Sequence, residues 1–248
     1  MTAARGSAGS CRRGGGAGNS SGDYLGAGLG KRERWALEAL RVAAAPAGRV
    51  TDGRVLLEGD LLNEPVEGRP RSWWTSYSFV GFERYLEGEF IGAEATGIGL
   101  KEGYASFWRG RLFGREFADY DRESFLRMCD LYDIGWIVTA RDDTRQRLES
   151  FAPSVTPITS QGSIGIFRVD RSASRIWRGT GSARGDASDI RLESTDGSAA
   201  IVKYHWIPGL TSTPPARLAP ANVDPDSPTP FLEIQPPGPG EYVIGWEP

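Results

Sequence analysis

The stretch of sequence that decides the fold is residues 121–139, Asp-Arg-Glu-Ser-Phe-Leu-Arg-Met-Cys-Asp-Leu-Tyr-Asp-Ile-Gly-Trp-Ile-Val-Thr. Apolar side chains recur in it at helical spacing, and Asp121 is a suitable N-cap, so the pattern predicts a helix over 121–132. The near-continuous apolar run 134–139 is typical of a strand that is buried on both faces, as in a parallel sheet.

The same alternation of helix and strand extends outward to about residues 31–170. Asp143, followed by Gln146 three residues later, resembles a capping box at the start of the next helix. The helices predicted beside 121–132 are 32–45 and 143–151, and the further strands are 53–58, 155–158 and 164–169. This order predicts an α/β domain with a small, partly parallel sheet and flanking helices.

After Arg171 the pattern becomes all-β. Eleven of the 16 prolines lie in 205–248, where they break helices and restrict strands to sheet edges. Asp196-Gly197 is typical of a hairpin turn. The predicted strands are 175–180, 189–193, 199–204, 231–234 and 242–246. We therefore expect a small β-sandwich-like module over 172–248, with a domain boundary near Arg171.

Composition restricts the function classes. The 248 residues carry a net charge of −3, which argues against nucleic acid as a partner because such binders usually have a basic excess. Two cysteines and one histidine exclude a disulfide scaffold, an iron–sulfur site and a multi-histidine metal site. We expect no cofactor, no metal and free thiols at Cys11 and Cys129. His205 is interpreted as a strand residue, because it has no evident catalytic partner.

Two parts of the chain lack regular periodicity. Residues 1–30 contain ten glycines and few bulky apolar side chains, which predicts a disordered Gly/Ser-rich tail. Residues 63–119 are rich in aromatic side chains and glycine, so we expect mainly an ordered loop that is held by buried rings. No apolar run approaches the roughly 18 residues of a membrane span.

Candidate ligand-binding residues cluster around the first predicted strand. Glu58 and Asp60 follow its carboxyl end, where open α/β sheets bind ligands. Trp73 and Trp74 offer flat faces for a sugar ring, and the loop that carries them is long enough to fold back over this edge. The alternatives are that Glu58 pairs with a nearby arginine and that the tryptophans fix the loop to the core.

Further candidates lie in two other segments. Arg111 and Arg115, within a stretch of three arginines, suit a phosphate group, although the acidic residues that follow offer them partners in their own loop. Arg141 and the Asp142-Asp143 pair follow the central strand and suit sugar hydroxyls or acid–base chemistry. The alternative for these two aspartates is that they only cap a helix.

The order of motifs resembles a known family. Gly53-Arg-Val-Leu-Leu-Glu58 is followed by Gly110-Arg-Leu-Phe-Gly-Arg115, and then by Leu131-Tyr-Asp-Ile-Gly-Trp-Ile-Val138. Lys203-Tyr-His-Trp-Ile-Pro-Gly-Leu210 comes later in the chain. Over about 31–248 this order resembles the soluble C-terminal extracytoplasmic region of bacterial polytopic GT-C-type glycosyltransferases and YfhO-like membrane proteins, without their membrane helices.

The resemblance implies an α/β region followed by a β module on the extracytoplasmic face of a membrane. The family's catalytic acidic residue lies between membrane helices, so no residue here matches it. The leading hypothesis is a non-catalytic accessory domain that positions a glycan or a lipid-linked sugar, with a membrane-embedded partner or a membrane region missing from this chain. The alternatives are a soluble carbohydrate-active enzyme that uses Glu58 and Asp60, and a purely structural interaction domain.

The sequence gives two conflicting indications of the cellular compartment. No signal peptide is visible at the start of the sequence, which favours the cytoplasm if the chain is complete as written, whereas the resemblance implies the outside. The low-complexity start allows two interpretations, a stand-alone module or the beginning of a fragment from a longer gene.

Overall fold

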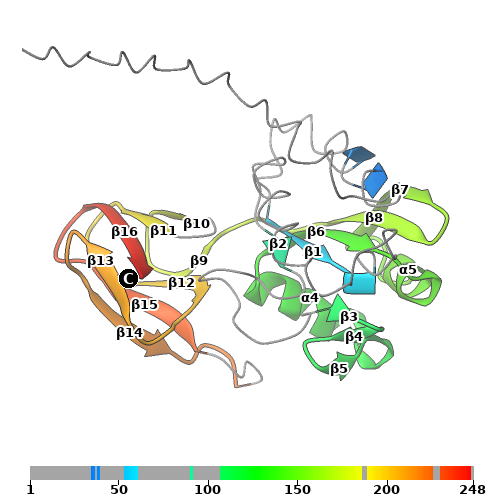
Figure 1. Ribbon diagram of the computed structural model, residues 1–248, viewed down its shortest axis with the longest axis horizontal. Coiled ribbons are helices and arrows are strands. Elements are labelled where there is room, and N and C mark those ends of the chain that lie inside the picture. Colours follow the sequence, from blue (N-terminus) through cyan, green and yellow to red (C-terminus); the bar gives the residue numbers. More distant parts are fainter. Residues whose placement is uncertain are drawn as a thin grey trace, which may run out of the picture.

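The chain forms two lobes that lie side by side, an α/β lobe and a β-sandwich lobe (Figure 1). The computed structural model describes residues 35, 36, 38, 39, 53–60, 90–91, 107–185, 189–225 and 230–246. The predicted tail, Cys11, Trp73 and Trp74 lie outside the described residues, as does most of the predicted helix 32–45.

The α/β lobe is built on a five-stranded mixed sheet, sheet A, with the strand order β2-β1-β6-β8-β7. Its strands in chain order are β1 (Arg54–Leu57), β2 (Phe90–Ile91), β6 (Ile134–Thr139), β7 (Val155–Gln161) and β8 (Ile164–Val169). β1 pairs in parallel with β2 and with β6, whereas β8 pairs antiparallel with β6 and β7. The prediction of a small, partly parallel sheet is confirmed.

Strand β7 is the last strand at one edge of sheet A and is mostly exposed. It contains Pro157, and its register against β8 shifts between Pro157 and Thr159. Proline has no backbone N–H to donate, which explains why it is found in an edge strand.

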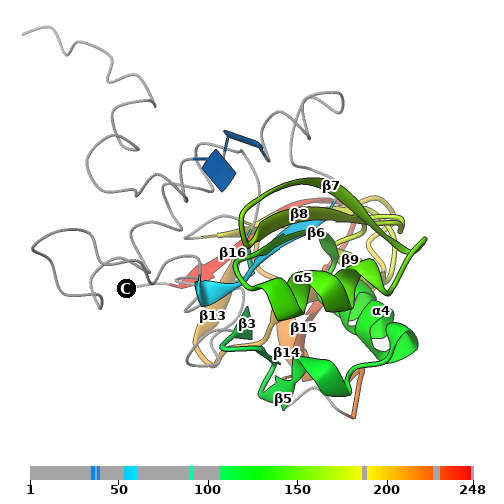
Figure 2. The ribbon, with the colours of Figure 1, turned by 90° about the vertical axis from the view of Figure 1, so that its right-hand side faces the viewer.

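Helices α4 (Arg122–Leu131) and α5 (Asp142–Glu149) lie on one face of sheet A (Figure 2). Asp121 caps α4 as predicted, because its side chain accepts a hydrogen bond from the Ser124 N–H at 2.7 Å. The predicted cap of α5 is wrong. Its N-cap is Arg141, and the Asp143 side chain instead pairs with the Arg141 guanidinium.

The two buried faces of β6 explain its continuous apolar sequence. Ile137 and the adjacent Leu56 belong to the core that packs against the helices. Trp136 and Val138, which alternate with Ile137 along the strand, are 5% and 2% exposed on the opposite face. The prediction of a strand that is covered on both sides is therefore confirmed.

The Arg-rich stretch folds as a small three-stranded antiparallel sheet. Its strands are β3 (Phe107–Trp108), β4 (Arg111–Leu112) and β5 (Arg115–Glu116), and a short 3-10 helix, Phe117–Asp119, follows. Phe107, Leu112 and Phe117 are buried in the main core, so buried rings hold this segment as expected.

The C-terminal lobe consists of two four-stranded antiparallel sheets packed face to face. One sheet has the order β10-β11-β16-β13 and the other β14-β15-β12-β9. The strands are β9 (Ile176–Arg178), β10 (Ser182–Gly185), β11 (Ile190–Ser194), β12 (Ala200–His205), β13 (Leu210–Thr213), β14 (Arg217–Ala221), β15 (Phe231–Gln235) and β16 (Gly240–Trp246). Inward side chains from both sheets form one core, which confirms the β-sandwich-like module.

Asp196-Gly197 does not form the predicted hairpin. The strands on either side of it, β11 and β12, belong to different sheets, so this turn carries the chain across the sandwich. Strands β10, β13 and β14 are not predicted by the sequence pattern either. Their exposed or half-exposed patterns, with Pro220 inside β14, lack the apolar alternation that identifies a strand.

The main core continues from the α/β lobe into the sandwich. Ile201, Ala221 and Phe231 from the sandwich belong to the same buried cluster as the side chains under α4. The ring of Tyr132, the C-cap of α4, lies 5.9 Å from that of Phe231. The lobes therefore share buried apolar surface, and the domain boundary near Arg171 stays a prediction.

Gly53 allows β1 to approach β6 closely, and its φ of +96° is in the region that favours glycine. A Cβ at this position would lie 2.6 Å from the Gly135 nitrogen, which is backbone and cannot move aside. We expect Gly53→Ala to lower the free energy of unfolding by about 3 kcal/mol, near the large end of single substitutions. Urea unfolding followed by tryptophan fluorescence measures this change.

Gly114 is the matched control. Its φ is +81°, but a Cβ there would meet nothing within 4 Å. Gly114→Ala should therefore cost only the backbone strain of about 1 kcal/mol. Equal losses for the two variants would show that the close approach of β1 and β6 is unimportant.

Candidate functional site

Glu58 lies at the carboxyl end of β1, beside the carboxyl end of the parallel strand β6. Its side chain is 0% exposed. Oε2 accepts hydrogen bonds from the N–H groups of Ala140 and Arg141 at 2.6 and 3.1 Å, and Oε1 accepts from the Thr144 hydroxyl at 2.7 Å. The carboxyl group thus joins the end of β1 to the segment that starts α5.

Burial raises the pKa of Glu58 from its usual value of 4.5 to about 7. The hydrogen bonds from Ala140 and Thr144 favour the ionised form but do not outweigh the loss of hydration. Glu58 therefore changes its charge near neutral pH.

Asp60, Arg141 and Asp143 form the exposed part of the same sheet edge. Asp60 accepts a hydrogen bond from the Arg109 backbone N–H at 2.7 Å. Arg141 donates to both oxygens of Asp143, at 3.0 and 2.6 Å, and its side chain is 39% exposed. The hydrogen bond to Asp143 raises the pKa of Arg141, and the charges of Asp143 and Asp60 add to this effect. The parallel pairing of β1 and β6 thus gathers two carboxylates and a guanidinium at one edge.

Arg111 and Arg115 have partners within their own segment. Arg111 pairs with Glu116 at 3.2 Å and donates to the Gly114 carbonyl. Arg115 lies over the Tyr120 ring at 4.5 Å and donates to the Asp119 carbonyl. These are the local contacts that the alternative interpretation expected. A phosphate-binding role for them, and a sugar-binding role for Trp73 and Trp74, stay predictions.

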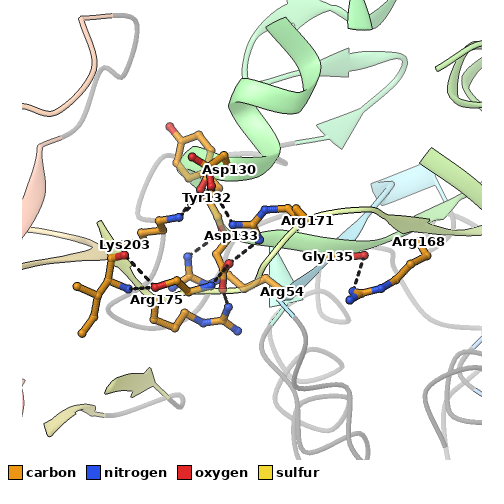
Figure 3. A network of polar contacts seen from close by, with 11 residues as sticks. Arg54, Asp130, Tyr132, Asp133, Gly135, Arg168, Arg171, Arg175 and Lys203 are labelled. Atoms are coloured by element: carbon orange, nitrogen blue, oxygen red, sulfur yellow. Dashed lines mark hydrogen bonds and ion pairs between the residues drawn. The ribbon is translucent and has the colours of Figure 1, made fainter. Parts of the chain in front are cut away.

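A second polar cluster, centred on Asp133, lies at the amino ends of β1 and β6 (Figure 3). Asp133 is 0% exposed. Its Oδ1 accepts from Arg171 Nη1 at 2.5 Å and from the Ser174 N–H at 2.8 Å, and its Oδ2 pairs with Arg175. The carboxylate thus binds the segment that leads from sheet A into the sandwich.

Asp130, one turn earlier on α4, extends this cluster to the sandwich. Arg171 Nη2 donates to its carboxylate at 3.0 Å, and Lys203 Nζ on β12 donates to its carbonyl at 2.6 Å. Burial alone would raise the pKa of Asp130, but the charges of Lys203 and Arg171 lower it on balance. Burial lowers the pKa of Lys203 to about 8, against the opposing effect of Asp130.

Arg54, the first residue of β1, connects sheet A with the end of α4 and with the sandwich. Its Nη1 donates to the Tyr132 carbonyl at 3.0 Å, and its guanidinium lies 4.5 Å from the centre of the Tyr204 ring on β12. Its backbone N–H donates to the Asp133 carbonyl at 2.6 Å. Sheet A, α4 and the sandwich therefore meet at one charged junction.

No local sequence pattern predicts this junction. Asp133 follows a helix and has a φ of +56°, a conformation that Asp and Asn adopt more readily than most residues. The available signal was a polar residue between a confident helix and a buried strand, with Arg171 and Arg175 at the expected domain boundary.

Comparison of the chain with protein-family models, curated proteins and solved structures finds no match. None of the helices in the described ranges has the length and apolar character that a membrane crossing requires. Within those same ranges, no group of three or more His, Cys, Asp or Glu side chains is placed to hold a metal ion.

The raised pKa of Glu58 makes stability depend on pH. An unfolded Glu58 ionises near 4.5 and the folded one near 7, so its contribution is fully present below pH 4.5 and is lost as pH rises through 7. We expect a loss of about 3 kcal/mol over this window. Glu58→Gln resembles the protonated group and lacks this pH dependence, whereas other titrating groups such as His205 act alike in both proteins, so the stability of the wild type relative to Glu58→Gln should fall by this amount. Urea unfolding at intervals from pH 4.5 to 8 measures both curves.

Glu58→Ala is the control, because it removes the acceptors and leaves two buried N–H groups without them. Its stability should lie about 2 kcal/mol below that of Glu58→Gln at every pH in this range. Parallel pH curves for the wild type and Glu58→Gln would contradict a buried, titrating carboxyl group.

Loss of the Asp133 charge should destabilise the junction. Asp133→Asn keeps a residue that tolerates the left-handed backbone but leaves Arg171 and Arg175 without a buried counter-charge. We expect a loss of about 3 kcal/mol, as when one partner of a buried ion pair is removed. Asp130→Asn is the control because the Asp130 side chain is 58% exposed, so its loss should be under about 1 kcal/mol. Thermal unfolding of the two variants measures the difference, and equal losses would show that burial at Asp133 is unimportant.

Proposed function

We propose that this chain is a non-catalytic accessory domain, related to the soluble region of membrane glycosyltransferases, that positions a glycan or a lipid-linked sugar. One observation carries the proposal: the parallel strands β1 and β6 present Asp60, Arg141 and Asp143 at one exposed edge. Carboxylates accept hydrogen bonds from sugar hydroxyls and a guanidinium donates to sugar oxygens, so this set suits a polar, hydroxylated ligand.

The environment of Glu58 supports a non-catalytic role. A general acid must come within hydrogen-bond reach of the group that it protonates. Both oxygens of Glu58 already accept hydrogen bonds from α5 and the residues before it, and its side chain is fully buried. In this proposal Glu58 stabilises the backbone at the sheet edge, and Asp60, Arg141 and Asp143 contact the ligand.

A second candidate function is a soluble carbohydrate-active enzyme that uses Glu58 and Asp60. The specific observation in its favour is the pKa of Glu58, about 7, which is suited to acid–base catalysis near neutral pH. Turnover that is abolished by Glu58→Gln would favour this enzyme over the accessory domain. Saturable binding without turnover would favour the accessory domain.

The test is binding of a panel of polyprenyl-phosphate sugars in detergent micelles and of soluble oligosaccharides to the full chain, with product analysis in parallel. We expect saturable binding, no product, and roughly thirtyfold weaker binding in Trp74→Ala. That factor corresponds to about 2 kcal/mol, as for an aromatic anchor at an interface.

Trp177→Ala is the matched control. Trp177 lies on β9 in the sandwich, is 40% exposed and has Lys203 Nζ 5.4 Å from the centre of its ring, so its loss should leave binding nearly unchanged and lower stability by less than about 1 kcal/mol. Equal weakening by Trp74→Ala and Trp177→Ala, or no saturable binding at all, would refute the proposed site. A collapse of thermal stability in Trp74→Ala would assign that ring to the core.

A further inference from the structure

His205 lies at the junction between the two lobes without a polar partner. It ends strand β12 and is 1% exposed. Neither of its ring nitrogens has a hydrogen-bond partner in the described part of the chain. The ring instead packs edge-on against Phe231 of β15 at 5.1 Å and against Tyr132 of α4 at 5.9 Å.

The groups around His205 disfavour a positive charge on its ring. Arg54 of β1 is a cation in electrostatic contact with it, and Tyr132 faces it from the end of α4. Phe231 of β15 and Phe113, which stacks on Tyr132 at 4.3 Å, are uncharged.

Further charged and titratable groups lie on the neighbouring elements. On β12 itself, Lys203 and Tyr204 directly precede His205 in the sequence. The Arg54 guanidinium lies over the Tyr204 ring. The nearby carboxylates Asp130 and Asp133 are already paired with Arg171, Lys203 and Arg175. No carboxylate among the described residues pairs with His205.

A protonated ring at this place would bury two N–H donors without acceptors, next to the Arg54 guanidinium. Such an uncompensated buried charge is strongly unfavourable. Burial and the charge of Arg54 accordingly lower the pKa of His205 to about 3. The ring gains a proton at milder acidity only when the junction opens and water reaches it.

We propose that the contact between α4, β1 and the sandwich is an acid-sensitive switch, in which protonation of His205 stabilises an opened junction. This inference is independent of the proposed glycan site, which lies at the opposite end of β1. An opened junction takes up the proton below the ordinary pKa of histidine, about 6.5. Between that pH and about 3, the opening equilibrium constant rises about tenfold for each pH unit that is lost.

The test uses hydrogen exchange of the full chain between pH 7 and 4.5, corrected for the intrinsic exchange rate at each pH. The reporters are two amides at the junction: Arg54 N–H, which donates to the Asp133 carbonyl, and Ser174 N–H in the segment between the lobes, which donates to Asp133 Oδ1. Their opening should increase about fiftyfold from pH 6.5 to 4.5 in the wild type. In His205→Phe, which keeps an aromatic ring, the same amides should show no such dependence.

Two further measurements separate the switch from a purely structural role. Amides in the pairing of β11 with β16 that exchange through local openings away from His205 should show no difference in pH dependence between the wild type and His205→Phe. The chain has a single histidine, so its ring signal in an NMR titration of the wild type is unambiguous. In the folded protein this signal should not titrate above about pH 4.

The proposal is overturned if the wild type and His205→Phe have the same pH slope at the junction, even when their absolute protection differs. It is also overturned if the ring of the folded protein titrates near pH 6.5. His205→Leu replaces His205→Phe if the latter does not fold. The NMR titration needs no variant and decides the question by itself if neither folds.

Discussion

The buried carboxylate of Asp133 is the interaction on which the arrangement of the two lobes depends. Its left-handed backbone ends α4 and turns the chain directly into β6. Its carbonyl receives the N–H of Arg54, which starts β1, and its side chain binds Arg171, Ser174 and Arg175 in the connecting segment. Removal of this buried charge would leave its arginine partners without their counter-charge, which is strongly unfavourable. It would therefore destabilise α4, sheet A and the connecting segment at the same time.

Strand β1 connects this junction with the proposed ligand site. It is four residues long, with Arg54 at the end that faces the sandwich. Glu58, directly after it, reaches α5. A shift of β1 along β6 would therefore disturb both ends at once.

The sequence predicts the elements whose signals are local. Asp121 caps α4, and the alternation of Ile137 with Trp136 and Val138 identifies a strand that is buried on both sides. It does not predict pairings between distant residues. The contact of Glu58 with Thr144 spans 86 positions, and the connection of Lys203 to Asp130 spans 73. The wrong hairpin at Asp196-Gly197 has the same origin, because a two-residue turn signal contains no information about which sheet the next strand joins.

The edge strand β7 determines how sheet A ends. Edge strands can recruit a strand from another molecule, because their outer backbone groups are unpaired. Pro157 lacks a donor, and the shifted register beside it interrupts the regular spacing of the remaining groups. A second copy of the chain therefore finds no continuous ladder to extend along β7. In this way β7 disfavours edge-to-edge association, and a substitution that restored a donor at Pro157 would remove one of these two obstacles.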